Sequence, residues 1–140
     1  MTIDHERVMT KITYIKEQLT DIQQLLHNKS KEQILKDPWI VKGLKYSLQT
    51  AIEAMIDIVF HICAKHFNKA PIDAKNGLEI LVENRVIDEN SFFVYSQMIG
   101  FRNRIVHGYQ QISDERLYEI VSKELGDFNK FVDSILKFIK

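Results

Sequence analysis

An arginine, a histidine and a tyrosine lie close together in the segment RNRIVHGY, residues 102–109. Arg102 could grip a phosphate through two parallel hydrogen bonds and stabilise developing negative charge. His107 could transfer a proton near neutral pH. Together they could cleave RNA without a metal: the 2′-hydroxyl would attack the neighbouring phosphorus, His107 would act as acid or base, and Arg102 would stabilise the charged intermediate.

The charge around this segment is unusual for the chain. The 140 residues carry 19 basic and 19 acidic side chains, so the formal net charge is zero and no global attraction to nucleic acid or acidic membranes is expected. No acidic residue occurs between Glu89 and Asp114, whereas Arg102 and Arg104 both fall inside that interval. Any polyanion would have to be held by a local patch, and the sequence predicts a local positive patch at this segment.

The spacing limits what these groups can do in one helix. Asn103 and His107 are four residues apart and share a face. Arg102 and His107 are five apart, so on a straight helix they diverge by about 140°. They converge on one ligand only if the helix ends near His107 or if two chains meet there. On spacing alone, an arginine, a histidine and a tyrosine near a helix end more often form a helix cap and a surface ion pair.

The rest of the chain favours helices. Two prolines and five glycines leave long stretches without helix breakers, and apolar residues recur at steps of three or four. Asp37-Pro38 is a good helix start, and Gly108 suits a left-handed helix stop. The pattern predicts helices over about 8–26, 38–67, 73–83, 88–107 and 113–140, with a short turn of helix at 31–36. We expect a single all-α domain over residues 1–140, an up-and-down bundle of four main helices plus a short fifth.

The helix expected from residue 38 is apolar on two sides, which is typical of a helix buried on two sides. One side, from Leu44 to Ile62, would face the core of its own bundle. Our hypothesis is that the second side packs against another copy of the chain in a homodimer. The alternative is a wholly internal helix in a monomer. The second side consists of Ile56, Phe60, Cys63 and Phe67.

A polar line containing Glu53, Asp57 and His61 runs between these two faces. Three interpretations are open: a metal site, an ordinary solvated or salt-bridged face, or a pairing in which Glu53 or Asp57 orients Arg102 or Arg104. Trp39, at the start of the same helix, is expected to pack in the core.

The composition indicates the cellular compartment and the absence of a cofactor. The single cysteine, Cys63, excludes an internal disulfide and fits a reducing compartment. No uninterrupted apolar run approaches the roughly 20 residues of a bilayer span, and we expect a cytoplasmic protein with no membrane contact. No glycine-rich phosphate loop and no cysteine or histidine metal cluster occurs, so no metal or cofactor is expected.

Arg102-x4-His107-x-Tyr109 resembles the Arg-x4-His-x-Tyr signature of HEPN domains (higher eukaryotes and prokaryotes nucleotide-binding), and more narrowly that of HepT-type toxins. LQTAIEAMIDIVFHI (residues 48–62) resembles the second-helix pattern of the family, and LEILVENRVID (residues 78–88) resembles its turn into the next helix. The resemblance covers roughly residues 44–140.

The resemblance implies an all-α homodimer with its cleft at the dimer interface. It implies the toxin of a type VII toxin–antitoxin system, an endoribonuclease with Arg102 and His107 as the catalytic pair. The partner would be a minimal nucleotidyltransferase antitoxin that transfers AMP onto Tyr109. Asn103 would orient the arginine, and Arg104 would add positive charge.

Two other functions are open, and the first of them uses the same residues as the nuclease. The chain could be a non-catalytic module that binds nucleotide and presents Tyr109 to a nucleotidyltransferase. It could also be a plain dimeric scaffold. The sequence does not separate these readings from the nuclease.

Overall fold

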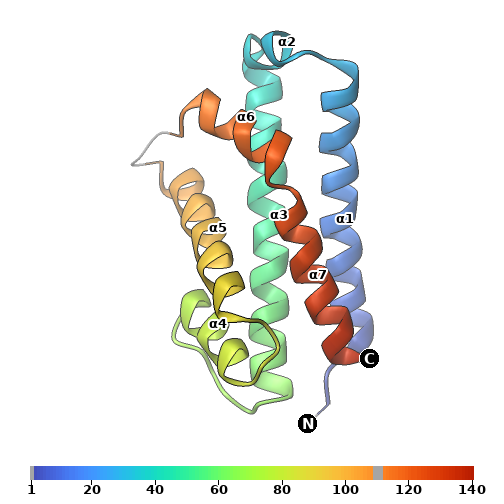
Figure 1. Cartoon of the computed structure of the whole chain (residues 1–140), viewed down its shortest axis with the longest axis vertical. Coiled ribbons are helices and arrows are strands. Elements are labelled where there is room, and N and C mark those ends of the chain that lie inside the picture. Colours follow the sequence, from blue (N-terminus) through green and yellow to red (C-terminus); the bar gives the residue numbers. More distant parts are fainter. Residues whose placement is uncertain (1, 109–111) are drawn as a thin grey trace.

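The computed structural model describes residues 2–108 and 112–140, and all the regular secondary structure in these ranges is helical. Figure 1 shows the order of the elements. Their bounds are α1 (His5–Asn28), α2 (Lys31–Leu35), α3 (Pro38–Lys65), α4 (Ala74–Glu83), α5 (Glu89–His107), α6 (Asp114–Lys123) and α7 (Gly126–Ile139).

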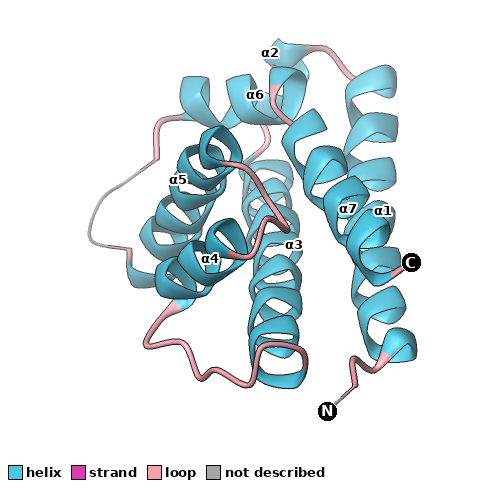
Figure 2. Cartoon of the chain, turned by 60° about the horizontal axis from the view of Figure 1, so that its bottom comes forward, coloured by secondary structure: helices cyan, strands magenta, loops and turns pink. Residues whose placement is uncertain are grey.

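Four long helices form an up-and-down bundle. α1 and α5 run in one direction, and α3 and α7 run in the other (Figure 1). α3 contacts α1, α4 and α5, and α4 packs beside α5 (Figure 2). The predicted all-α bundle is confirmed, with α2, α4 and α6 as short connecting helices.

The segment predicted as one last helix, 113–140, is instead two helices, and that prediction was wrong. α6 ends at Lys123, and α7 begins at Gly126. The apolar spacing continues unbroken through Leu125, which is buried, so periodicity alone hides the break. The break falls at Glu124 and Leu125, just before Gly126, and glycine is a poor helix former. It lets α6 cross the end of the bundle while α7 turns down alongside α1 (Figure 1).

α3 is the central helix of the core. Its buried face packs against α1, α4 and α5, and the buried residues form one continuous cluster. By length and composition alone α3 could cross a membrane, although no uninterrupted apolar run in the sequence is that long. In the most apolar 18-residue stretch of α3, 56% is buried inside the bundle, as expected for a core helix.

Trp39 does not pack in the core as the sequence analysis expected. Its side chain is 79% exposed, on the first turn of α3. The core face of α3 is centred near Leu44, Leu48 and Met55, and at 100° per residue Trp39 lies almost opposite that face. Applied to this residue, the helical periodicity predicts exposure.

Two glycines provide a test of the packing between α3 and α4. A methyl group on Gly77 would lie 2.7 Å from Val59 Cγ1, a buried branched side chain, whereas one on Gly43 would meet nothing within 4 Å. We expect Gly77→Ala to destabilise the fold by about 1–3 kcal/mol through overpacking. Gly43→Ala should stabilise it by about 0.5–1 kcal/mol. Urea unfolding would measure both, and equal effects would contradict this account of the α3–α4 contact.

His61 makes the stability of the fold depend on pH. Its Nε2 accepts a hydrogen bond from the backbone N–H of Asp4 at 3.0 Å, which requires an unprotonated nitrogen. Burial, and then the nearby Arg7 guanidinium, lower the pKa of His61 below its ordinary value. The unfolded chain therefore binds this proton more readily, so stability should be full above about pH 6.5 and fall on acidification.

The matched variant is His61→Gln, whose amide oxygen can accept a hydrogen bond without titrating. Urea midpoints at pH 7.5 and 5.5 should drop further for the wild type than for the variant. Equal losses would show that His61 does not contribute to the pH dependence.

Candidate active site

α5 presents the candidate catalytic residues at its carboxyl end. Asp88 caps the start of the helix by accepting the Ser91 N–H at 2.7 Å. Gly108 ends it with φ +69°, donating its N–H to the Arg104 carbonyl at 3.1 Å, as the sequence predicted. His107 lies exposed in the last helical turn. Tyr109, the expected AMP acceptor, lies outside the described residues.

Arg102 is held by Glu53 across the interface between α5 and α3. Its Nε and Nη2 donate to Glu53 Oε2 at 3.0 and 2.7 Å, and its Nη1 donates to Asn103 Oδ1 at 3.1 Å. The two charged side chains are 28% and 34% exposed, so water only partly screens them. Of the two predicted partners, Glu53 is therefore the one that contacts Arg102, and Asn103 contacts it too.

With respect to residues 2–108 and 112–140, these bonds leave part of the guanidinium available. A guanidinium has five N–H donors, and the three contacts above use one on each nitrogen. One N–H remains on Nη1 and one on Nη2, the pair that binds a phosphate in bidentate fashion.

Arg102 borders an open hollow of about 700 Å³ between α3, α4 and α5, which we name the α3–α5 cleft. A cleft of this size accommodates a nucleotide-sized ligand. It is lined by Glu53, Ile56, Asp57, Phe60, Asp73, Ala74, Lys75, Ser96, Ile99, Gly100, Arg102 and Asn103.

Asp57 lies in this cleft but does not pair with either arginine. Its carboxylate forms an ion pair with Lys11 of α1, at 2.9 Å. The suggestion that Asp57 orients Arg102 or Arg104 is therefore wrong, because a lysine remote in sequence takes that carboxylate.

The polar line does not form a metal site in the described residues. Glu53 contacts Arg102, Asp57 contacts Lys11, and His61 accepts from the Asp4 backbone. Residues 2–108 and 112–140 contain no group of three potential metal ligands. Among the three interpretations, the salt-bridged face and the orienting carboxylate both apply, at different residues.

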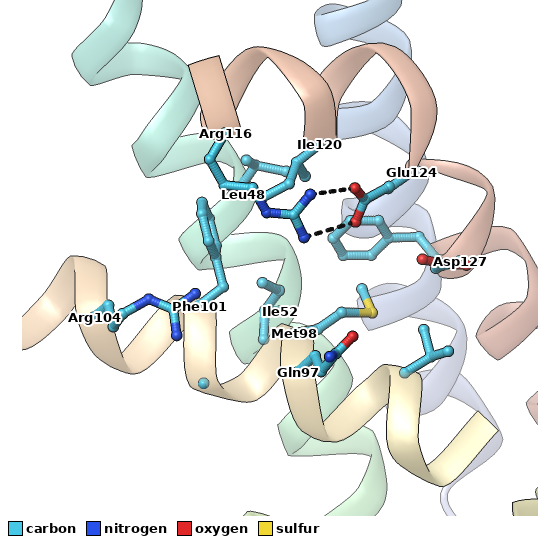
Figure 3. A pocket seen from close by; sticks show the side chains of 13 residues that line it. Leu48, Ile52, Gln97, Met98, Phe101, Arg104, Arg116, Ile120, Glu124 and Asp127 are labelled. Atoms are coloured by element: carbon cyan, nitrogen blue, oxygen red, sulfur yellow. Dashed lines mark hydrogen bonds and ion pairs between the residues drawn. The ribbon is translucent and has the colours of Figure 1, made fainter. Parts of the chain in front are cut away.

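Arg104 lies on the other side of α5, away from Arg102. It borders a smaller cavity of about 200 Å³ between α3, α5, α6 and α7, and its guanidinium lies 5.9 Å from the centre of the Phe101 ring. In the same cavity Arg116 pairs with Glu124 (Figure 3). The positive patch predicted from the sequence is thus divided between two cavities, and Glu53 neutralises one half of it.

α5 ends at His107, one of the two conditions for Arg102 and His107 to converge, but it remains a regular helix up to that residue. His107 is not among the residues that line the α3–α5 cleft. It lies five residues further along α5, a rise of about 7.5 Å and a rotation of about 140°. The divergence noted in the sequence therefore persists in the fold.

The other candidate groups are structural. Burial raises the pKa of the Cys63 thiol to about 11, so at neutral pH it is protonated and inert. Its Sγ lies 3.6 Å from the Gly77 carbonyl oxygen, inside the α3–α4 contact. Phe67 packs against Phe138 of α7. Of the four residues assigned to contact a second copy, Cys63 is therefore buried within the chain, and Ile56, Phe60 and Phe67 are half-buried.

Sequence reasoning missed Lys11 and the contribution of α4 to the cleft. Lys11 carries no local signal, because its partner is 46 residues away. Asp73 was expected only as a helix cap, which it is, accepting the Asn76 N–H at 2.8 Å. It also lines the cleft, a position that depends on the packing of α4 against α3.

An up-and-down helical bundle with an Arg-x4-His pair at the carboxyl end of its third long helix defines a HEPN-type domain. The chain belongs to the HepT-like ribonuclease family, whose family model (ribonuclease HepT-like) matches residues 15–135. It is 30% identical over 128 residues to the mRNA nuclease HepT of Shewanella oneidensis, and the aligned residues are 91% of this chain and 95% of that protein.

Two solved structures have the same fold. The tri-AMPylated HEPN toxin of Shewanella oneidensis, in complex with MNT antitoxin, superposes with a TM-score of 0.86 at 29% identity over 94% of this chain and 97% of that one. A toxin–antitoxin complex with AMP-PNP gives a TM-score of 0.82 at 28% identity, over 92% and 97% of the two chains.

Glu53 and Asp57 form a matched pair for testing the site, since both are carboxylates of α3 in the same cleft. We expect Glu53→Gln to lower RNA cleavage at least tenfold, because Arg102 loses the charge that fixes its orientation. Asp57→Asn, which breaks only the Lys11 contact, should leave cleavage within about twofold of the wild type.

Both variants should lose no more than about 1 kcal/mol of unfolding free energy, the usual size for a partly exposed ion pair. Cleavage of a labelled RNA and urea unfolding measure the two quantities. A larger loss of activity in Asp57→Asn than in Glu53→Gln would contradict the assignment of Glu53 as the positioning residue.

Proposed function

We propose that this chain is the toxin of a toxin–antitoxin pair, a cytoplasmic endoribonuclease that uses Arg102 and His107 without a metal. The observation that carries the proposal is the Arg102 guanidinium, held by Glu53 with two N–H groups left over, on a helix that ends at His107. Membership of the HepT-like family and the RNA-cleaving activity named for its Shewanella relative support the same reaction.

The reaction needs a base, an acid and a charge stabiliser. An imidazole takes the proton of the RNA 2′-hydroxyl, and the 2′-oxygen forms a bond to the adjacent phosphorus. The bond from phosphorus to the 5′-oxygen breaks, and that oxygen receives a proton. The products are a 2′,3′-cyclic phosphate and a 5′-hydroxyl. Arg102 binds the negatively charged oxygens while five atoms surround the phosphorus.

A homodimer would resolve the divergence of Arg102 and His107. Two copies that meet along the α3–α5 cleft would bring the histidine of one copy toward the arginine of the other, and would supply two imidazoles for the base and acid roles. The half-buried Ile56, Phe60 and Ile99 at the cleft offer apolar surface for such a contact. The whole of residues 1–140 would act as one domain in each copy.

The regulatory partner in this proposal is a minimal nucleotidyltransferase antitoxin. It would transfer AMP onto Tyr109, two residues beyond His107. The added phosphate would compete for Arg102 by charge and obstruct the cleft by bulk. The solved relatives, one tri-AMPylated and bound to MNT antitoxin and one a toxin–antitoxin complex with AMP-PNP, support this assignment.

The test is expression without a partner, followed by cleavage of total RNA by the purified chain. The wild type should arrest growth and cut RNA with EDTA present. Arg102→Ala and His107→Ala should each lower the cleavage rate by about 10²–10⁴-fold, the range for loss of a catalytic proton or charge. Asn103→Ala should reduce it less, and Tyr109→Phe should retain cleavage but accept no AMP.

Arg104→Ala is the matched control, since this arginine is on the same helix but borders a different cavity. Its cleavage rate should stay within about threefold of the wild type. Harmless expression of the wild type, together with stable AMP transfer onto Tyr109, would replace the nuclease with a non-catalytic binding partner. Mass photometry should detect a species of twice 16.5 kDa, and a sole 16.5 kDa species would refute the dimer.

A further inference from the structure

Two aromatic side chains stand exposed on the amino-terminal half of α3. Trp39 is 79% exposed and Tyr46 is 63% exposed. Seven residues separate them, which is close to two helical turns, so both rings lie on the same side of the helix. Large aromatic side chains are buried in most proteins, so two exposed rings on one helix are unusual. Trp39 is the only tryptophan of the chain.

The surface between the two rings is open and basic. Lys42 Nζ lies 4.9 Å from the centre of the Trp39 ring. A methyl group on Gly43, midway between the rings, would meet no atom within 4 Å. Lys45 is half-buried and lies about 100° around the helix from Tyr46, and no Asp or Glu occurs between Asp37 and Glu53. We call Trp39, Lys42 and Tyr46 the aromatic–basic stripe.

The stripe runs into the candidate active site. Glu53, which holds Arg102, is a further seven residues along α3, so it lies on the same side as Tyr46 and about 10 Å away along the axis. α5 runs antiparallel to α3 (Figure 1), so the carboxyl end of α5 points toward the half of α3 that carries the stripe. From the Arg102–Glu53 contact, His107 is about 7.5 Å further in that direction, near the level of Leu48.

We propose that the aromatic–basic stripe binds single-stranded RNA on one side of the cleaved phosphate. Unpaired bases stack on Trp39 and Tyr46, and Lys42 contacts the phosphates between them. Stacking on exposed aromatic rings beside basic groups is the general way that proteins hold single strands. RNA is the expected ligand because the stripe is positively charged and continues into the Arg102 cleft. The inference rests on the proposed ribonuclease function and assigns the surface along which its RNA substrate binds.

The test uses the full chain with His107→Ala, so that the RNA stays intact, and a 5′-fluorescein-labelled 12-nucleotide single-stranded RNA of mixed sequence. Fluorescence anisotropy gives the dissociation constant. The emission of the single tryptophan reports stacking directly, and it should be quenched with the same midpoint. We expect Trp39→Ala and Tyr46→Ala each to weaken binding by about tenfold. Lys42→Ala should weaken it and lower its dependence on salt.

Two variants serve as controls. Phe93→Ala removes an aromatic ring of α5 that is also 63% exposed and should leave binding unchanged. Trp39→Phe keeps a stacking ring and should restore most of the affinity lost in Trp39→Ala.

The outcomes distinguish a failure of this inference from a failure of the proposed ribonuclease function. If the wild type cleaves RNA but the Trp39 and Tyr46 variants bind as tightly as the parent, or Trp39 emission is unchanged, the stripe is not the track. If those variants instead dissociate a dimer or lose only antitoxin binding, the stripe is a protein interface and the inference is overturned. If the wild type neither cleaves nor binds RNA, the proposed function itself fails.

Discussion

The contact between Arg102 and Glu53 is the constraint on which the site depends. It joins the helix that carries the proposed catalytic residues to the central helix of the core, with both bonds directed to one carboxylate oxygen. A guanidinium held along one edge in this way keeps its other edge in a fixed direction, which lowers the cost of ordering it when a phosphate binds. The same carboxylate partly neutralises the arginine, so that the unliganded cleft does not carry an isolated positive charge at the α3–α5 interface.

α3 can serve both the core and the site because its sides differ. One side buries leucine, isoleucine and valine side chains against the rest of the bundle. The opposite side carries, from its amino-terminal end, Trp39, Tyr46, Glu53 and Asp57, which remain at least partly exposed. An RNA substrate bound as proposed along this side would pass from Trp39 and Tyr46 to Arg102 along a single rigid helix. Rigid placement of this kind suits catalysis, because small displacements of a reacting group lower the rate strongly.

Local patterns in the sequence predict most of the helices but not the tertiary pairing of charges. The spacing of apolar residues, the helix start at Asp37-Pro38 and the stop at Gly108 predict α1, α3 and α5 closely, because these signals act within one or two turns. The carboxylate that would meet Arg102 could not be chosen from the sequence, since Glu53 and Asp57 are one turn apart on the same face. Only the packing of α1 against α3 decides it, by placing Lys11 at Asp57. The apolar character of Trp39 predicts burial, but its position on α3, opposite the core face, leaves its ring exposed.

The most direct test of the account is a crystal structure of the full chain with a short RNA that carries 2′-O-methyl groups and so cannot be cleaved. The account predicts a phosphate bound by the Nη1 and Nη2 edge of Arg102, with Glu53 still on Nε and an imidazole from His107 of either copy within hydrogen-bond distance. A phosphate bound instead beside Arg104 and Arg116, with the Arg102 cleft empty, would contradict it.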